Sequence, residues 1–138
     1  MSWVILIVDD SATTRALIRE EFEARGARVL EASNGKEGLW RIHAEPIDLI
    51  VCDIHMPVMD GLQMIQELRK LPEHATTPVF VLTSDAAVTR AREGKKAGAN
   101  AWVAKPINAA SLWKAVEKAL FGKPSRSTLP GTPPGDRS

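Results

Sequence analysis

The chain has 138 residues, and its 18 lysines and arginines against 17 aspartates and glutamates leave a formal net charge of +1. This length is typical of one domain with a sizeable core, and the charge balance argues against direct binding of nucleic acid, which needs a basic excess. The single cysteine, Cys52, excludes a disulfide framework and a multi-cysteine zinc site. No apolar run approaches the ~20 residues that cross a bilayer, so we expect no membrane insertion and a cytoplasmic location.

Five short apolar runs predict β-strands. Four are nearly continuous in β-branched and aliphatic residues, which is typical of strands buried on both faces of a parallel sheet. The run Arg28–Ala32 alternates with polar residues, which favours an edge strand. The five runs are Trp3–Val8, Arg28–Ala32, Ile47–Cys52, Val79–Leu82 and Ala101–Ala104.

Amphipathic segments between and after these runs predict five helices. The first has Ser11 as its candidate N-cap and ends at Gly26, and the fourth covers Ala86–Ala97. The second follows the Asn34-Gly35 turn, the third follows Asp60-Gly61, and the fifth presents Leu112, Val116 and Leu120 on one side. The alternation of strands and helices predicts an α/β domain built on a five-stranded parallel sheet, with helices on both faces.

The composition changes near Gly122. The segment from Gly122 to Ser138 contains four of the nine prolines and one large aliphatic residue, Leu129. Such a segment buries too little apolar surface to offset the entropy lost on ordering. We therefore predict a folded domain over residues 1–121 and a disordered tail over residues 122–138.

Chemically active side chains follow four of the five predicted strands. Asp9 and Asp10 follow the first strand, Asp53 the third, Thr83 the fourth and Lys105 the fifth. The carboxyl ends of parallel strands lie at one edge of the sheet, where ligands bind in this fold class. Clustered carboxylates repel one another unless a cation lies among them, and hard oxygen ligands favour Mg²⁺. A carboxylate beside Mg²⁺ can attack phosphorus to form an aspartyl-phosphate, with Lys105 and Thr83 supplying positive charge and a donor.

Five motifs in this order make the chain resemble the receiver domain of two-component response regulators, over residues 3 to about 121. They are VDD (Val8–Asp10), NGKEGL (Asn34–Leu39), CDIHMPVMDG (Cys52–Gly61), LTS (Leu82–Ser84) and KKAGANAWVAKP (Lys95–Pro106). The resemblance implies a flavodoxin-like sheet with strand order 2-1-3-4-5, an order that is known for this family. It also implies Mg²⁺ as cofactor and a histidine kinase or phosphotransfer protein as phosphoryl donor.

The resemblance assigns roles residue by residue. Asp53 matches the phosphoacceptor, Asp10 the direct Mg²⁺ ligand and Asp9 its water-mediated partner, while the backbone carbonyl of His55 completes the protein ligands. His55 lies two residues after Asp53 and Asp85 two residues after Thr83, and at both positions the residue type varies in the family and tunes the rate of autodephosphorylation.

Further roles concern the response to phosphorylation. Thr83 matches the switch hydroxyl and Lys105 the ammonium, each of which binds a phosphoryl oxygen. The bond before Pro106 is cis in the family. Trp102 matches the switch aromatic, which is usually Tyr or Phe, although a tryptophan at the end of a strand also commonly serves packing alone.

The leading hypothesis is therefore a stand-alone receiver that signals through the surface of the fourth helix, fifth strand and fifth helix. Its output is expected to pass to a downstream protein or along a phosphorelay. The alternative is a Mg²⁺-dependent phosphohydrolase of the haloacid dehalogenase type, but that family has a second aspartate where this chain has His55.

We also expect His43 and His74 at the surface, Cys52 in the core, and Trp40 and Trp113 partly exposed.

Overall fold

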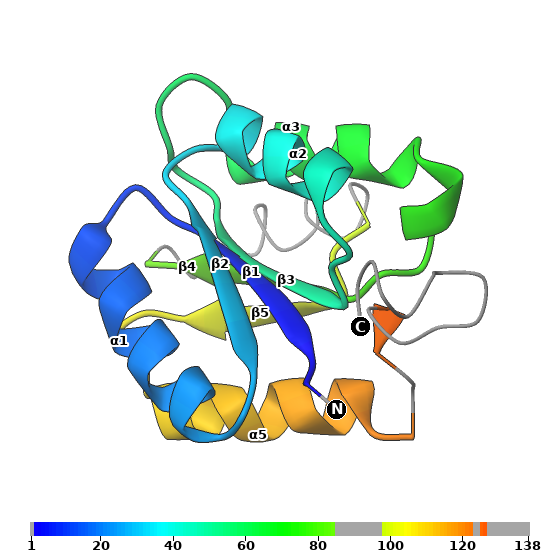
Figure 1. The fold of residues 1–138 in the computed structure, drawn as a ribbon. Helices are drawn as coiled ribbons and strands as arrows, with labels where there is room; N and C mark the ends of the chain where they lie inside the picture. Colours follow the sequence, from blue (N-terminus) through cyan, green and yellow to red (C-terminus); the bar gives the residue numbers. More distant parts are fainter. Residues whose placement is uncertain (1, 85–97, 123–124, 127–138) are drawn as a thin grey trace.

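The computed structural model describes residues 2–84, 98–122 and 125–126. Within these ranges one sheet of parallel strands has the order β2-β1-β3-β4-β5 (Figure 1). The predicted α/β class and the strand order implied by the resemblance are both confirmed. The strands are β1 (Val4–Val8), β2 (Arg28–Ala32), β3 (Leu49–Asp53), β4 (Val79–Thr83) and β5 (Ala101–Ala104).

Burial along the strands follows their place in the sheet. Every residue of β1, β3 and β4 is buried, as the continuous apolar runs predicted. The alternating β2 lies at an edge, where Arg28 is exposed. The prediction for β5 was wrong, because its residues are partly buried or exposed. The sheet order places β5 at the opposite edge of the described sheet, so only β4 pairs with it.

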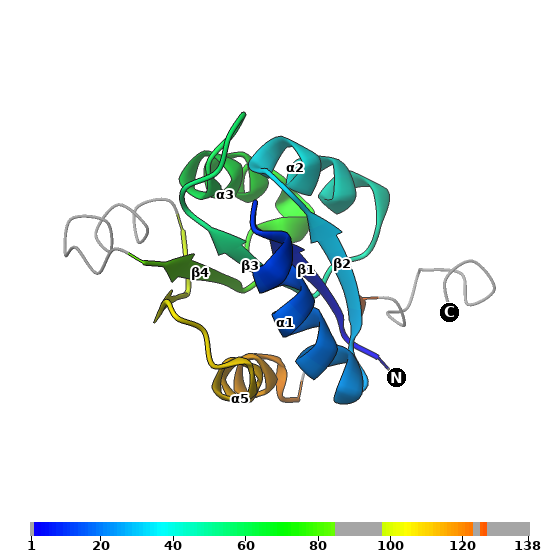
Figure 2. The ribbon, with the colours of Figure 1, turned by 90° about the vertical axis from the view of Figure 1, so that its left-hand side faces the viewer.

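Helices cover both faces of the sheet (Figure 2). On one face lie α2 (Gly35–Ala44) and α3 (Gly61–Arg69), and on the other lie α1 (Ala12–Ala24) and α5 (Ala109–Leu120). A short 3₁₀ helix, η1 (Pro72–His74), follows α3. The helix predicted over Ala86–Ala97 lies outside the described residues. No helix in the described part of the chain is long and apolar enough to span a membrane.

Side chains at the helix N-termini explain where these helices begin. Ser11, the predicted N-cap, accepts a hydrogen bond from the Thr14 amide, and Asn34 and Asn108 cap α2 and α5 in the same way. Asp60 forms a capping box with Gln63 at the start of α3. Three of these helices thus begin immediately after the loops that follow β1, β2 and β3.

Two apolar cores lie on the two sides of the sheet. One packs α2 and α3 against the sheet, and the other packs α1 and α5. Cys52 is buried in the first core, as predicted, and Trp40 is exposed. Trp113 was expected to be partly exposed but is buried, because its ring packs edge-on against Phe22 of α1 with centroids 5.1 Å apart.

The expectation for His74 fails at the amino edge of the sheet, where the strands begin, and two residues beyond Gly122 make contacts at the same edge. His74 is buried rather than exposed, since η1 turns it toward Thr77. Ser125 and Arg126 belong to the segment expected to be a disordered tail, yet both donate hydrogen bonds to Asp48. The rest of that segment beyond Gly122 lies outside the described residues.

Candidate functional site

The sheet register brings the predicted residues to one edge. Val8 at the end of β1 pairs with Cys52, so Asp9 follows directly beside Asp53 at the end of β3. Asp53 in turn pairs with Leu82, and Thr83 pairs with Ala104. Lys105 follows Ala104. The chemically active side chains predicted at the strand ends therefore all lie at the carboxyl edge of the sheet.

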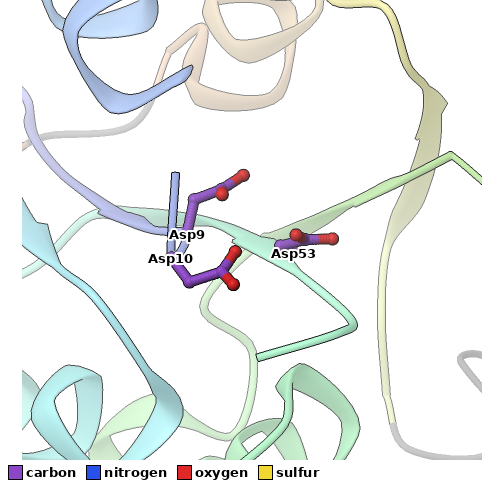
Figure 3. A group of neighbouring side chains, drawn as sticks. All are labelled: Asp9, Asp10 and Asp53. Carbon is purple, nitrogen blue, oxygen red and sulfur yellow. The ribbon is translucent and has the colours of Figure 1, made fainter. Parts of the chain in front are cut away.

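Three carboxylates form a cluster there. One oxygen from each of Asp9, Asp10 and Asp53 lies within 4.8 Å of the others (Figure 3). Asp9 is fully buried and Asp53 nearly so, whereas Asp10 is exposed. The Ser11 amide donates to Asp9 Oδ1, and the Ile54 amide donates to Asp53 Oδ1, both at 2.8 Å. Backbone donors therefore hold the two buried carboxylates in place from the loops that begin at the strand ends.

Lys105 bridges the two buried carboxylates. Its Nζ lies 3.2 Å from Asp9 Oδ2 and 3.2 Å from Asp53 Oδ2. Burial works against the charged ammonium, but Asp53 and Asp9 outweigh it and raise the pKa of Lys105. The peptide bond from Lys105 to Pro106 is cis, as the resemblance implied.

Negative charge exceeds positive charge within the cluster. Burial is the main reason why the pKa of Asp9 is raised, and the Asp53 carboxylate raises it further, while the Ser11 amide and Lys105 oppose this shift. Among the described residues one ammonium faces three carboxylates. Carboxylate oxygens on one open side suit a hard divalent cation that keeps several of its waters. The donor set thus fits a site for such a cation.

Comparison with known proteins identifies the family. The family model "Response regulator receiver domain" matches residues 5–117. The chain belongs to the response regulator receiver family. Receivers are phosphoacceptor signalling domains of two-component systems, so the match supports that function and not the phosphohydrolase alternative.

Relatives and solved structures agree with this assignment. Protein PilH of Pseudomonas aeruginosa is 35% identical over 118 residues, which cover 86% of this chain and 98% of that protein. The chemotaxis response regulator CheY4 of Vibrio cholerae has a TM-score of 0.83 at 31% identity, covering 87% of this chain and 100% of that one. The receiver domain of sensor histidine kinase PA1611 from Pseudomonas aeruginosa has a TM-score of 0.78 at 25% identity, covering 86% and 97%. That receiver is described with a magnesium ion coordinated in its active-site cleft.

The other predicted residues of this receiver surround the cluster at different depths. Thr83 is buried at the end of β4, and its carbonyl accepts from the Lys105 amide at 2.8 Å. His55 is exposed in the loop after β3. Trp102 packs against the core under α2 and α3, and its buried Nε1 has no hydrogen-bond partner among the described residues. The structure therefore brings Asp9, Asp53 and Lys105 into direct contact and leaves Trp102 on the neighbouring core.

Sequence reasoning missed an arginine that supports the receiver's acidic pair. Nη1 of Arg15 donates to the Asp9 carbonyl at 2.6 Å, and its Nε donates to Glu31 at 2.9 Å. Burial disfavours the Glu31 carboxylate, but Arg19 and Arg15 outweigh burial and lower its pKa. The only signal in the sequence was that Arg15 lies one helical turn after the N-cap Ser11, which places it above the end of β1.

A glycine was also missed. The Gly61 amide donates to the Ile54 carbonyl at 3.0 Å, which closes the loop after β3. A Cβ on Gly61 would lie 2.1 Å from the Asp53 carbonyl oxygen, so only glycine fits there without a shift of backbone. The Asp60-Gly61 pair was read only as a helix start, although it also sets the path of the loop that carries His55.

Proposed function

We propose that Asp53 accepts the phosphoryl group, and that the donor is a phosphohistidine of a histidine kinase or phosphotransfer protein. We choose Asp53 among the three carboxylates because it both contacts Lys105 and is partly accessible to a phosphoryl donor. The side chain of Asp53 is 10% exposed, whereas that of Asp9, the other partner of Lys105, is 0% exposed. Asp10 is exposed, but the Lys105 ammonium contacts the other two carboxylates.

In the proposed transfer a carboxylate oxygen of Asp53 forms a bond to phosphorus while the phosphorus–nitrogen bond of the donor breaks. The electron pair stays on the departing imidazole, which takes up a proton. Lys105 is already within hydrogen-bond distance of Asp53 and pairs with one phosphoryl oxygen. The Thr83 hydroxyl, one residue beyond the Asp53–Leu82 pair of β3 and β4, donates to another.

We propose Mg²⁺ as the cofactor of this site. Asp10, Asp53 and the backbone carbonyl of His55 would ligate it directly, and Asp9 through a water molecule. When bound it supplies positive charge that offsets both the clustered carboxylates and the phosphoryl oxygens. The all-oxygen donor set and the magnesium ion described for the PA1611 receiver support this choice.

We further propose that phosphorylation draws Thr83 toward the phosphoryl group and that Trp102 turns into the space left behind. The unpartnered, buried Nε1 supports the choice of Trp102, since a buried donor without an acceptor favours an alternative packing. The readout is a population shift at the surface of β5, α5 and the predicted helix Ala86–Ala97. A downstream protein or a phosphorelay partner reads this surface, without direct contact to nucleic acid. A cytoplasmic location belongs to the same proposal.

Treatment of the protein with acetyl phosphate and Mg²⁺ tests the assignment. Intact-mass spectrometry should show one added phosphoryl group, and Asp53→Asn should lose it. Asp60→Asn is the matched control, because Asp60 lies in the same loop and asparagine caps a helix as well as aspartate. Loss of labelling in the control, or labelling that persists in Asp53→Asn, would contradict the choice of Asp53.

A further inference from the structure

A buried carboxylate at the amino edge of the sheet accepts hydrogen bonds from two separate segments of the chain. Asp48 precedes β3 and is 5% exposed. It accepts hydrogen bonds from the Val4 amide at 2.7 Å, from the Ser125 hydroxyl at 3.0 Å and from the Arg126 amide at 2.6 Å. A buried carboxylate is costly unless donors surround it. Two of its three donors come from the segment after α5.

The guanidinium of Arg126 makes a second contact at this edge. Its Nη2 lies 2.9 Å from Oγ1 of Thr77, a residue that is 1% exposed and precedes β4. The same Oγ1 lies 2.8 Å from His74 Nδ1. Because a guanidinium only donates, the Thr77 hydroxyl accepts from Arg126, and the direction of its bond to His74 Nδ1 follows from the tautomer of that ring. The two bonds therefore link Arg126 through Thr77 to the buried His74.

The residues that accept bonds from Ser125 and Arg126 are held in place by other parts of the fold. Arg69 of α3 donates to the carbonyl of His74 at 2.8 Å and to the carbonyl of Thr77 at 2.7 Å. The Val4 amide fixes Asp48 from β1. An open recess of about 300 Å³ next to Arg126 is also lined by Glu45 and Glu73, whose charges favour a cation there. A site whose acceptors are held in place by other parts of the fold loses little entropy on its own side when it binds.

We propose that the amino edge of the sheet is a binding site for a Ser-Arg dipeptide and that Ser125 and Arg126 occupy it as a latch. The latch fastens the chain after α5 to the beginnings of β3 and β4. The folded domain then extends to Arg126 rather than to residue 121. Ser125 and Arg126 then lie at the edge of the sheet opposite Asp53, since Asp48 directly precedes β3 and Asp53 is its last residue.

Hydrogen exchange of the full chain tests the latch directly. The Arg126 amide should exchange at least about tenfold more slowly than in an unstructured peptide, because it donates to a buried carboxylate. Exchange at the unstructured rate would overturn the proposal. Ser125→Ala removes the hydroxyl bond to Asp48, and we expect it to accelerate exchange of the Arg126 amide.

Substitutions in the full chain give a second, independent test. Arg126→Ala should lower the Tm by about 5 °C. In a Thr77→Val background the same substitution should lower the Tm much less, because the guanidinium has already lost its partner there. Arg25→Ala is the matched control, because Arg25 forms an exposed pair with Glu21 and should change the Tm by less than about 1 °C. An Arg126→Ala variant that melts like the Arg25→Ala control would overturn the latch. Phosphorylation by acetyl phosphate should be unchanged in Arg126→Ala, which separates the latch from the proposed chemistry at Asp53.

Discussion

The two edges of the sheet hold buried aspartates in opposite electrostatic settings. At the carboxyl edge Asp9 and Asp53 share one ammonium with each other, and Asp10 adds a third carboxylate nearby. At the amino edge the single Asp48 accepts three hydrogen bonds, and its neighbours Thr77 and His74 are paired as well. One edge keeps an excess of negative charge, and the other has its acceptors satisfied.

This contrast separates a site built for chemistry from one built for stability. Unbalanced charge at the carboxyl edge costs folding free energy, but it suits the divalent cation and the Mg²⁺-dependent phosphoryl transfer that we propose there. At the amino edge the Asp48 carboxylate is already hydrogen-bonded to three donors and is therefore poorly suited to bind a cation. It stabilises the fold, because its removal would leave these donors without an acceptor. Substitution of an aspartate should therefore have opposite effects at the two edges.

The largest expected effect is that of Asp48→Asn. An amide nitrogen in place of one carboxylate oxygen faces N–H and O–H donors, so the free energy of unfolding should fall by about 3 kcal/mol. Denaturant unfolding at neutral pH without divalent ions measures it. A variant as stable as the parent chain would show that the amino edge does not depend on this carboxylate.

The next effect concerns His74 and pH. Burial, and then the charge of Arg126, lower the pKa of His74 to about 4, with Arg69 and His43 acting in the same direction and Glu73 opposing them. Because this pKa lies below the unfolded value of about 6.5, the neutral imidazole stabilises the fold above pH 6.5. That stability is lost as the pH falls from 6.5 toward 4, by on the order of 2–3 kcal/mol.

Urea unfolding at several pH values measures this dependence. His74→Gln should flatten the curve between pH 6.5 and 5, where few carboxylates titrate, whereas His43→Gln should not. An unchanged slope in His74→Gln would mean that another group is responsible.

The smallest effect is expected from Mg²⁺ at the carboxyl edge. At a concentration about tenfold above its Kd, Mg²⁺ should raise the free energy of unfolding by about 1.4 kcal/mol. Asp10→Asn should abolish this response while raising the stability of the metal-free protein, since it removes one of three mutually repelling carboxylates. If Asp10→Asn instead lowered the free energy of unfolding in the absence of Mg²⁺, as we expect for Asp48→Asn, the proposed difference between the two edges would be contradicted.

Much of the fold was predictable because a parallel sheet leaves a simple pattern. The central strands read as continuous apolar runs, and the helix starts at Ser11, Asn34 and Asp60 carry capping side chains. β5 was harder, because aliphatic residues at an edge strand look the same in sequence as those in a central one. Trp113 was misjudged because its partner Phe22 lies on a helix far away in sequence.

The carboxyl edge was also predictable, since strand topology alone places residues that follow parallel strands together. The contacts of Lys105 with Asp9 and Asp53 follow from that rule and from the order of the motifs. The support from Arg15 and Gly61 depends on loop geometry that no spacing rule supplies.

The amino edge could not be predicted in the same way. Its network joins residues before β1, β3 and β4 with two residues beyond α5, and no residue type among them signals the others. The composition after Gly122 favours disorder on average, and a local average cannot identify two residues that find buried partners at a distance of 77 and 78 positions along the chain.

The most direct measurement of the central claim is the position of the phosphoryl group in the full chain. After acetyl phosphate and Mg²⁺, borohydride reduction converts an aspartyl-phosphate into a homoserine that peptide sequencing by mass spectrometry locates. The account predicts homoserine at position 53 alone. Homoserine at Asp9 or Asp10 in place of Asp53, or equal reduction in the absence of Mg²⁺, would contradict it.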